Sequence, residues 1–499
     1  MRIIAQRFTG KRFLLLFGIV FLLMQSCRQE ENVMELQEQT DDNPSMSRDE
    51  LNQEIIDVLL EQQDLRWDDL SDEALTSAFL LSDKYITVAW DKNATSDVEK
   101  EAIIDFIYQS EGKLAGAEGV ILEVDDELKL LHAQIDKVET LLGLRRLDET
   151  AALDVYYEVF TEEEIQEMAQ NLENNLPGSV GRITGNPHYF DHHEIEEAWN
   201  AGLSGAGLEV AVIDNGPQVG DPIWGQNGDP HQANPQPNRS VSKKGRHKPM
   251  WWWPWASYDG VYSQGNLIPL VASHGSDMLK VIGNPDGGVN PIASKGIAYR
   301  SDIRSVRGAN IFWIDIPRNV YGVTKSFKYL ANKSDVRIIS MSMGGFWNWV
   351  SVERAIEKCY NNGKMIISSS GTAILSPPVS ALLGTSPGAM TLFPARFKPY
   401  TLAATGVKNT GDPKPTQWCT WCFGKADFVV EFNSGQGSSS QSAAATAGMA
   451  ALIWAREPFL SRDDVIAKMK AAADWPNSPD LEFGYGRINM QTYLDNEGI

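Results

Sequence analysis

From about residue 205 onward, short apolar runs that suit buried strands alternate with stretches that suit helices. The strand-like runs are LEVAVI at 208–213, DIRSVRG at 302–308, RIISMSM at 337–343, KMIISSS at 364–370 and YTLAATG at 400–406. The helical stretches lie at 274–282, around 351–361 and from Ser440 onward. This alternation predicts βαβ units, a mostly parallel sheet covered by helices, and reactive groups at the carboxyl ends of the strands.

Three blocks in this part of the chain carry an acid, an imidazole and a hydroxyl. They are VAVIDNG with Asp214, SHGSDMLKVIG with His274 and SSSQSAAATAG with Ser440. A serine hydroxyl is a weak nucleophile at neutral pH, so it needs a base within hydrogen-bond reach and a carboxylate that fixes the tautomer of that base. We therefore predict that these three residues form a catalytic triad.

The order of these blocks resembles that of the subtilisin-like serine peptidases. Further matches are ISMSMGGF at 339–346, FPARFKPYTLAATGV at 393–407 and FGYGRIN at 483–489. The resemblance covers residues 185–495 and implies a subtilisin-like three-layer α/β fold and a serine endopeptidase that works through an acyl-enzyme. Among five serines between 434 and 442, Ser440 reproduces the family's nucleophile, because it stands eight residues before Gly448.

The resemblance also assigns an oxyanion hole, and here the chain departs from the family. Subtilisins place an Asn donor after the strand that follows SxGG, whereas SSSGT puts Thr372 at that position. Removing such a donor costs roughly 10² to 10³ in turnover, so we expect a slow peptidase. The second donor would be the backbone at Ser440, at the N-terminus of its helix. Milder departures are Asn215 for Thr or Ser, Ser439 for Thr and Ala444 for Pro.

By the same resemblance, Ser342, Met343, Gly344 and Gly345 form the segment that binds an extended substrate as an added strand. The implied partners are protein or peptide substrates. The long connection between Asp214 and His274 holds four tryptophans within 251–255. They either rim the cleft or pack as the core of an insertion, and packing is the preferred interpretation because Trp is mostly buried in proteins.

The first 27 residues have the layout of a bacterial export signal. A basic stretch precedes an apolar run from Phe13 to Met24, and Ser26 and Cys27 follow. The small residue before cysteine resembles a lipobox, so we expect Cys27 to be lipidated and the protein to sit in the bacterial cell envelope, facing the periplasm or the cell surface. The alternative is an ordinary secretory signal whose Cys is removed. No later stretch has the roughly 20 apolar residues of a membrane span.

Two regions separate this signal from the peptidase-like part. Residues 28–48 are polar and acidic and predict a flexible tether. Residues 49–178 predict a small α+β domain, with a Pro- and Gly-containing linker at 174–190 after it. Its helical patterns lie at 49–62, 95–109 and 127–144, and its strand-like runs at 85–90, 119–124 and 154–160. The domain is either a propeptide, which we favour, or a permanent accessory domain.

Charge and cysteines limit the partners and cofactors. A net charge of −22 argues against nucleic acid and against electrostatic docking on anionic lipid, and leaves a lipid anchor as the membrane contact. WCTWC at 418–422 has redox or zinc spacing, but a closed zinc site needs four ligands, so we expect at most a local disulfide between Cys419 and Cys422. No cofactor is required and no metal-ligand set can be read. Calcium stays open, because subtilisins often bind it. We expect a monomer.

Two other functions fit the same residues. A degenerate homologue would keep the cleft and bind peptides without cleaving them, as the changes at Thr372 and around Ser440 suggest. A transpeptidase would hand the acyl group to an amine instead of water.

Overall fold

A computed structural model describes most of the chain from residue 43 onward. The described residues are 43–62, 64–161, 164, 167, 192–216, 239–241, 274–284, 295–309, 311–371, 391–419, 422–432 and 437–499. Contacts group the chain into Met1–Asn43 and Pro44–Ile499, and the fold below is that of the second unit. Within the described residues, no helix has the length and apolar character of a membrane span.

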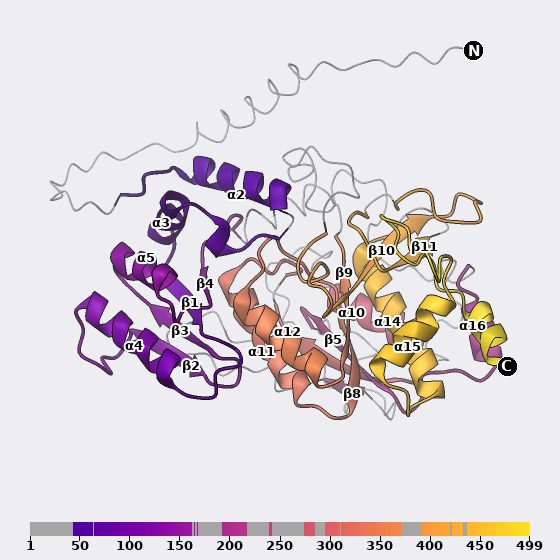
Figure 1. Ribbon diagram of the computed structural model, residues 1–499. Coiled ribbons are helices and arrows are strands. Elements are labelled where there is room, and N and C mark those ends of the chain that lie inside the picture. Colours follow the sequence, from indigo (N-terminus) through magenta and orange to yellow (C-terminus); the bar gives the residue numbers. More distant parts are fainter. Residues whose placement is uncertain are drawn as a thin grey trace, which may run out of the picture. The chain divides into compact units, whose positions relative to one another are not determined.

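The N-terminal domain, residues 44–160, is a small α+β unit. Its elements in chain order are α2 (Arg48–Gln62), the 3-10 helix η1 (Trp67–Asp69), α3 (Asp72–Leu80), β1 (Tyr85–Ala89), α4 (Val98–Glu111), β2 (Ile121–Asp125), β3 (Leu130–Gln134), α5 (Val138–Arg146) and β4 (Ala152–Val155). The four strands form an antiparallel sheet in the order β2-β3-β1-β4. The α+β prediction for this region therefore agrees with the structure (Figure 1).

The helix predicted over 127–144 is wrong in its first half. The structure has β3 at Leu130–Gln134, and only the second half is helical, in α5. Lys129 turns the chain with a φ of +56°, and β3 then pairs with both β1 and β2. Pairing on both edges buries four consecutive residues of β3 and overrides the helical pattern of the sequence. The strand expected at 154–160 likewise ends earlier, in β4.

The peptidase-like part is built on a seven-stranded sheet. Its elements in chain order are α7 (Ile195–Asn200), β5 (Glu209–Asp214), β6 (Arg239–Val241), α10 (His274–Gly283), β7 (Asp302–Arg307), α11 (Pro317–Ala331), β8 (Val336–Met341), α12 (Val350–Asn361), β9 (Met365–Ser369), β10 (Leu402–Lys408), β11 (Phe428–Phe432), α14 (Ser439–Arg456), α15 (Arg462–Ala471) and α16 (Met490–Glu497). The strand order is β11-β10-β9-β8-β5-β7-β6, and every pair is parallel. The predicted three-layer α/β fold is confirmed.

Alternate residues of each strand face opposite layers of helices. Val210 and Val212 of β5 join a core that contains α10 and α14, whereas Ala211 and Ile213 join a core that contains α11 and α12. This period of two places Asp214, the last residue of β5, on the α10 and α14 side. The carboxyl edge of the sheet and the N-termini of α10 and α14 therefore hold the three predicted catalytic residues (Figure 1).

Candidate active site

Asp214 and His274 lie in direct contact at the carboxyl end of β5. His274 Nδ1 is 2.8 Å from Asp214 Oδ1 and 3.0 Å from Oδ2. Because a carboxylate only accepts hydrogen bonds, Nδ1 is the protonated nitrogen of the neutral ring, and the lone pair lies on Nε2. The Asp214 side chain is 2 % exposed and that of His274 13 % exposed, so the acid is enclosed while the imidazole reaches the surface of the site.

The surroundings of His274 favour a proton on its ring. Burial acts to lower the pKa of His274, but the charge and hydrogen bond of Asp214, together with the charge of Asp277, outweigh burial and raise the pKa above its ordinary value. The Phe312 ring lies 5.6 Å from the imidazole, centroid to centroid, and encloses its flank. A ring of this kind can take up a proton from a neighbouring hydroxyl and then release it.

Asn215 and Gly275 fix the start of the helix that carries His274. Asn215 Oδ1 accepts a hydrogen bond from the Gly275 N–H at 2.9 Å, and the Asn215 N–H donates to Asp214 Oδ1 at 2.7 Å. A Cβ at position 275 would lie 2.4 Å from the Gly216 carbonyl oxygen and 2.6 Å from Asn215 Oδ1. Asn215, which from sequence was only a departure from the family pattern, therefore joins the Asp214 strand to the His274 helix.

Ser440 lies in the first turn of α14. A capping box begins this helix, with Ser438 Oγ accepting from the Gln441 N–H at 3.2 Å. Ser440 Oγ donates to the Ser342 carbonyl at 3.4 Å, and Ser342 Oγ donates to the Ser440 carbonyl at 3.0 Å. Among the described contacts, none joins Ser440 to His274. Catalytic hydrogen bonds are often long without substrate and tighten when it binds, so this geometry leaves the triad as a prediction.

The predicted substrate segment, Ser342–Gly345, is fully buried and partly occupied by the chain itself. The Gly344 N–H donates to the Phe312 carbonyl at 3.3 Å, and its own carbonyl accepts from Ile314. Gly345 exchanges both backbone hydrogen bonds with Phe393, at 2.9 and 3.0 Å. The backbone groups of both glycines thus have internal partners, and strand addition by substrate stays a prediction that would have to use Ser342 and Met343 or displace these pairings.

A buried carboxylate, Asp315, organises the loop that follows this segment, and sequence reasoning did not identify it. It accepts hydrogen bonds from the Phe346 N–H at 2.5 Å, from the Trp349 indole at 2.8 Å and from the Trp347 N–H at 3.4 Å. Burial raises the pKa of Asp315 to about 6, against these bonds. A Cβ at Gly345 would lie 2.3 Å from Asp315 Oδ1. A lone acid inside the apolar run WIDI was the one available hint.

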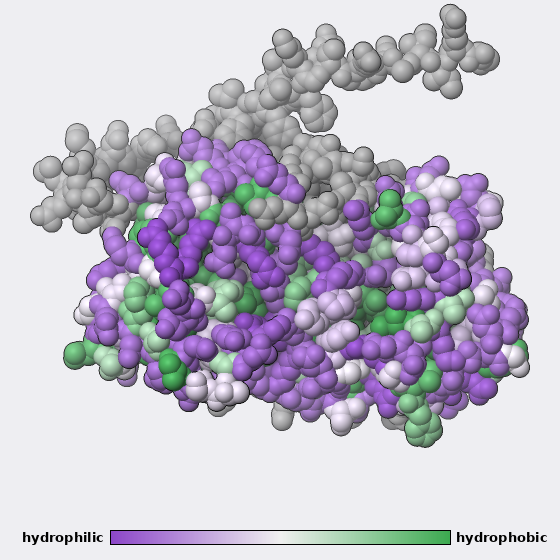
Figure 2. All heavy atoms as spheres, in the orientation of Figure 1, coloured by the Kyte–Doolittle hydropathy of each residue, from purple (hydrophilic) through white to green (hydrophobic). Residues whose placement is uncertain are grey.

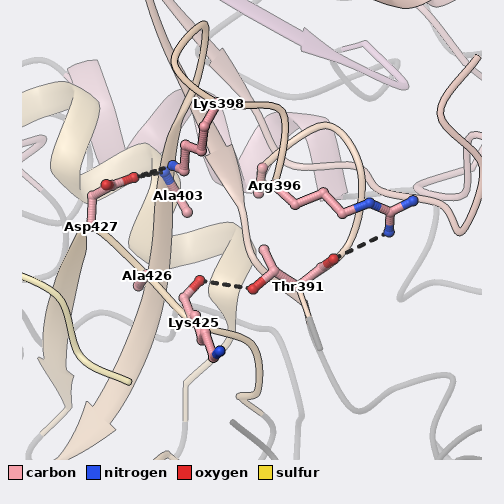
Figure 3. A pocket seen from close by; sticks show the side chains of 8 residues that line it. Thr391, Arg396, Lys398, Ala403, Lys425, Ala426 and Asp427 are labelled. Carbon is pink, nitrogen blue, oxygen red and sulfur yellow. Dashed lines mark hydrogen bonds and ion pairs between the residues drawn. The ribbon is translucent and has the colours of Figure 1, made fainter. Parts of the chain in front are cut away.

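A pocket of about 190 Å³ lies next to the 391–398 segment (Figure 3). Lys398 and Asp427 point toward each other on one side of it and form an ion pair. The Arg396 guanidinium extends the other way and donates to the Thr391 carbonyl at 3.2 Å and to Asn348 Oδ1. Because these two cations already have partners, we assign the pocket no role in substrate binding.

The strand-end segment before Thr372 is braced by a disulfide loop. Cys419 and Cys422 form a disulfide with a Cα–Cα distance of 5.1 Å, which is the local bridge expected from sequence. The Phe423 N–H donates to the Gly371 carbonyl at 3.1 Å, and a Cβ at Gly371 would meet the Phe423 ring at 2.3 Å.

Several predicted features lie outside the described residues. These are the Thr372 oxyanion donor, the tryptophans at 251–255, the 174–190 linker and Cys27. Within the described part of the chain, no cluster of His, Cys, Asp and Glu side chains could hold a metal ion. Calcium binding remains an expectation from the family resemblance.

The parallel sheet with an Asp–His pair at the end of a central strand is consistent with a subtilisin-like fold, and the chain is similar in sequence to a protease of this class. It is 24 % identical to the minor extracellular protease Epr of Bacillus subtilis (strain 168) over 314 residues, which is 60 % of this chain and 40 % of Epr. The match thus spans less than half of that relative. No protein-family model matches the chain.

Solved structures similar to this chain include two of MycP1 proteins. MycP1 from the ESX-1 type VII secretion system is 18 % identical, with a TM-score of 0.45, and covers 64 % of this chain and 88 % of its own. MycP1 from Mycobacterium smegmatis is 18 % identical, with a TM-score of 0.43, over 64 % of this chain and 86 % of its own. The fold assignment itself rests on the sheet topology described above.

Proposed function

We propose that this chain is a serine endopeptidase that cleaves peptide bonds outside the cytoplasm. The observation that carries the proposal is the Asp214–His274 pair, held at 2.8 Å where β5 ends, at the edge of the sheet where the first turn of α14 carries Ser440. Similarity to an extracellular protease supports the same activity. The class of substrate is a protein or peptide.

In this mechanism Ser440 Oγ attacks the carbonyl carbon of the peptide bond while its proton moves to His274 Nε2. Asp214 keeps the Nδ1 proton in place and stabilises the imidazolium that forms. The tetrahedral intermediate collapses as the C–N bond breaks, and His274 gives its proton to the leaving amine. An ester on Ser440 remains. Water, deprotonated by the same imidazole, then hydrolyses this ester and restores the hydroxyl.

The developing oxyanion would be stabilised by backbone N–H groups in the first turn of α14 and by the side chain of Thr372. Backbone N–H groups in the first turn of a helix have no acceptor within the helix, and the helix dipole favours negative charge there. Threonine is shorter than the asparagine of the family, so we propose a slow enzyme. Thr372→Asn should raise kcat, by up to about 10² if the amide reaches the oxyanion. An unchanged kcat in a folded variant would assign the donor to another group.

A fluorophosphonate probe, which forms a covalent bond with an activated serine, tests the proposal. We expect the purified full chain to be labelled, and Ser440→Ala to lose the label and about 10⁶ in kcat. Ser442→Ala is the matched control, because Ser442 lies in the same helix and its hydroxyl donates to the Ser438 carbonyl. Labelling that survives in Ser440→Ala would move the nucleophile elsewhere.

A peptide-binding protein without catalysis is the second candidate. It is favoured by the Ser440 hydroxyl, which donates to the Ser342 carbonyl. A chain that binds peptides but is never labelled would establish it. A transpeptidase uses the same acyl-enzyme, and the masses of products formed with an added amine would separate it from a hydrolase.

We also propose the domain order read from the sequence: a signal at 1–27, a tether at 28–48, an N-terminal domain at 49–178 and a peptidase domain at 185–495. A lipid on Cys27 would attach the protein to the cell envelope. Incorporation of a fatty-acid probe tests this, and Cys27→Ser is the control that should abolish it. Unchanged labelling of Cys27→Ser would place the lipid elsewhere, and absence of label in the natural chain would favour a secreted protein.

A further inference from the structure

We infer that the cleft beside Ser440 takes about two substrate residues before the bond that is cut, because the segment Phe312–Ile314 of the protein itself fills the place where a third would pair. We call Phe312–Ile314 the blocking segment, and we call the part of the substrate before the cut bond its acyl side. The inference rests on the proposed function and defines a substrate class for it: peptides that are recognised through a short acyl side.

The predicted substrate segment has two edges, and the protein itself pairs with both. Successive residues of an extended chain direct their backbone N–H and C=O groups to opposite edges. Gly345 exchanges both hydrogen bonds with Phe393, at 2.9 and 3.0 Å, so its backbone groups face the edge toward residue 393. Gly344 therefore faces the opposite edge, and so does Ser342, two residues before it. A peptide added as a strand on that edge would pair with Ser342 and Gly344.

The blocking segment already holds both backbone groups of Gly344. The Gly344 N–H donates to the Phe312 carbonyl at 3.3 Å, and the Gly344 carbonyl accepts from the Ile314 N–H at 3.0 Å. Trp313, between these two partners, forms a parallel bridge with Gly344. A third acyl-side residue would need the same N–H and the same carbonyl, so the added strand ends where the blocking segment begins.

Ser342 keeps a place for the residue next to the cut bond. Its carbonyl accepts from Ser440 Oγ at 3.4 Å, whereas hydroxyl hydrogen bonds are usually roughly 2.7–2.8 Å long. Such a long bond is readily exchanged for one from a peptide N–H when the hydroxyl turns to His274 Nε2. The first acyl-side residue then pairs with Ser342. By the alternation along a strand, the second residue makes no bond to this segment, and the third would meet Gly344, whose backbone groups are taken.

The blocking segment is fixed by packing and does not act as a lid. Trp313 is 2 % exposed and Ile314 is fully buried. The Trp313 carbonyl accepts from the Asn319 side chain at 2.7 Å, and the Trp313 ring packs edge-on against Phe346, with centroids 4.9 Å apart. The next residue, Asp315, accepts three hydrogen bonds from the neighbouring loop. A peptide that displaced the segment would bring both buried side chains into water, which costs more than its own two hydrogen bonds return.

Phe312 makes the blocking segment a wall for the second acyl-side residue. The Phe312 ring lies 5.6 Å from the His274 imidazole, centroid to centroid, and is only partly buried. The second residue lies between the place beside Ser342 and the blocking segment, so its side chain has this ring as a neighbour. Because an aromatic ring favours apolar contacts, we expect a preference for an apolar second residue.

Beyond the second residue, the chain of a longer substrate leaves the cleft into solvent. Among the described residues, none of the large apolar side chains that are exposed belongs to the blocking segment or to the predicted substrate segment. On the face drawn in Figure 2, apolar residues are scattered among hydrophilic ones. The described surface thus offers a longer acyl side no large apolar patch beside the blocking segment.

A series of substrates of increasing length tests the inference. Each substrate is an N-acetylated peptide whose cut bond is an amide to an aminocoumarin, and its acyl side grows from two to four residues while the two residues next to that bond stay the same. We expect kcat/KM of the full chain to rise less than about threefold, whereas the hydrogen bonds of a longer added strand would raise it about tenfold or more. A rise of that size would overturn the inference.

A pair of phenylalanine variants tests the wall formed by Phe312. With two-residue substrates, Phe312→Ala should reduce the preference for an apolar over a polar second residue by about threefold or more, because the contact with the ring is lost. Phe459→Ala is the matched control and should leave the preference unchanged, since Phe459 is fully exposed and lies between α14 and α15. Equal preferences in the two variants would contradict the position given to the second residue.

Two measurements separate this inference from the proposed function. A fluorophosphonate has no acyl-side residues, so its reaction with Ser440 reports the activated serine alone, and a chain that is never labelled would overturn the proposed function. Binding of fluorescent peptide acids of two and four residues to Ser440→Ala, followed by anisotropy, needs no catalysis. We expect dissociation constants within about threefold of each other. Binding of the longer acid that is tighter by about tenfold would overturn the inference, in an active enzyme and in an inactive peptide-binding protein alike. If neither acid binds, the substrate series decides for a chain that is labelled, and a chain without label would overturn both proposals.

Discussion

The two faces of the seven-stranded sheet use different side chains for different tasks. Toward α14 the packing relies on small residues: the helix buries six alanines and Gly448, where a Cβ would lie 2.8 Å from Ile297. Toward α11 and α12 it relies on large ones, with Trp313, Trp347 and Trp349 joining the core that the N-terminal domain completes. Small residues let a reactive helix start close to the strand ends, whereas large aromatic residues provide area for a second domain.

The largest expected effect is a loss of catalysis on the reactive face, by which we mean the side of the sheet toward α10 and α14 that carries Asp214, His274 and Ser440. Asp214→Asn keeps an oxygen for the Asn215 N–H but allows the other tautomer of His274, so kcat should fall by about 10⁴ while the free energy of unfolding changes little. Steady-state peptide hydrolysis and thermal unfolding measure both quantities. A fall of less than tenfold would remove Asp214 from the mechanism.

The docking face is the side of the sheet toward α11 and α12, where the N-terminal domain packs. There the largest effect should be on the free energy of unfolding. Trp67→Ala removes a fully buried ring stacked on Trp347 and should lower the free energy of unfolding by about 3–5 kcal/mol. If the two domains share one core, chemical denaturation should show a single shifted transition. Two separate transitions, with only the first one shifted, would show that the domains unfold independently.

The sequence predicted the reactive face better than the docking face, for a physical reason. Val210 to Ile213 read as a buried strand because both faces of the sheet are covered, and Asp214 directly after them predicted its own position at the strand end. The stretch at 130–134 read as part of a helix because its pairing partners, β1 and β2, lie elsewhere in the chain. The strand at 210–213 could be predicted from its local pattern, whereas the conformation of 130–134 depends on pairing with strands elsewhere in the chain.

The candidate site shows the same limit. His274 and its neighbour Asp214 follow from local motifs, whereas the bonds between Ser440 and Ser342 and those of Asp315 to the 346–349 loop join residues that are tens of positions apart. The contact of Trp67 with Trp347 crosses 280 positions. The sequence around Trp67 is acidic and helical in pattern, and nothing in it predicts contact with a residue so distant in the chain.

A smaller effect on the reactive face tests whether close packing sets its geometry. In Gly275→Ala, the new methyl would collide with the Gly216 carbonyl and with Asn215 Oδ1, and so move His274 relative to Asp214. We expect kcat/KM to fall by about 10², because a displacement of about 1 Å has that effect on a catalytic group. Lys280→Ala, in the last turn of the same helix, is the control and should stay within about twofold. Equal rates for both variants would show that the helix can shift without consequence.

The last prediction compares one buried histidine from each domain by its effect on how the free energy of unfolding changes with pH. Per pH unit, this is the smallest of the expected effects. Burial is the main cause that lowers the pKa of His193 to about 3 and the pKa of His132 to about 4. Both histidines are neutral in the folded protein and bind a proton when the protein unfolds below their ordinary pKa of about 6.5. The folded state is therefore most stable relative to the unfolded state above that pH, and it loses this stability as the pH falls toward 3 or 4. Each should cost up to about 1.4 kcal/mol per pH unit within this window.

A substitution at each histidine tests this pH dependence. His193 donates from Nδ1 to the Ile488 carbonyl and accepts from the Glu431 N–H. His193→Asn keeps a donor and an acceptor but does not titrate, so the free energy of unfolding should fall less steeply as the pH is lowered. An equal flattening by His132→Asn would fit one cooperative unit that spans both domains. A slope that neither variant changes would assign the acid sensitivity to carboxylates whose pKa is lowered in the folded state, such as Asp125 beside Lys328.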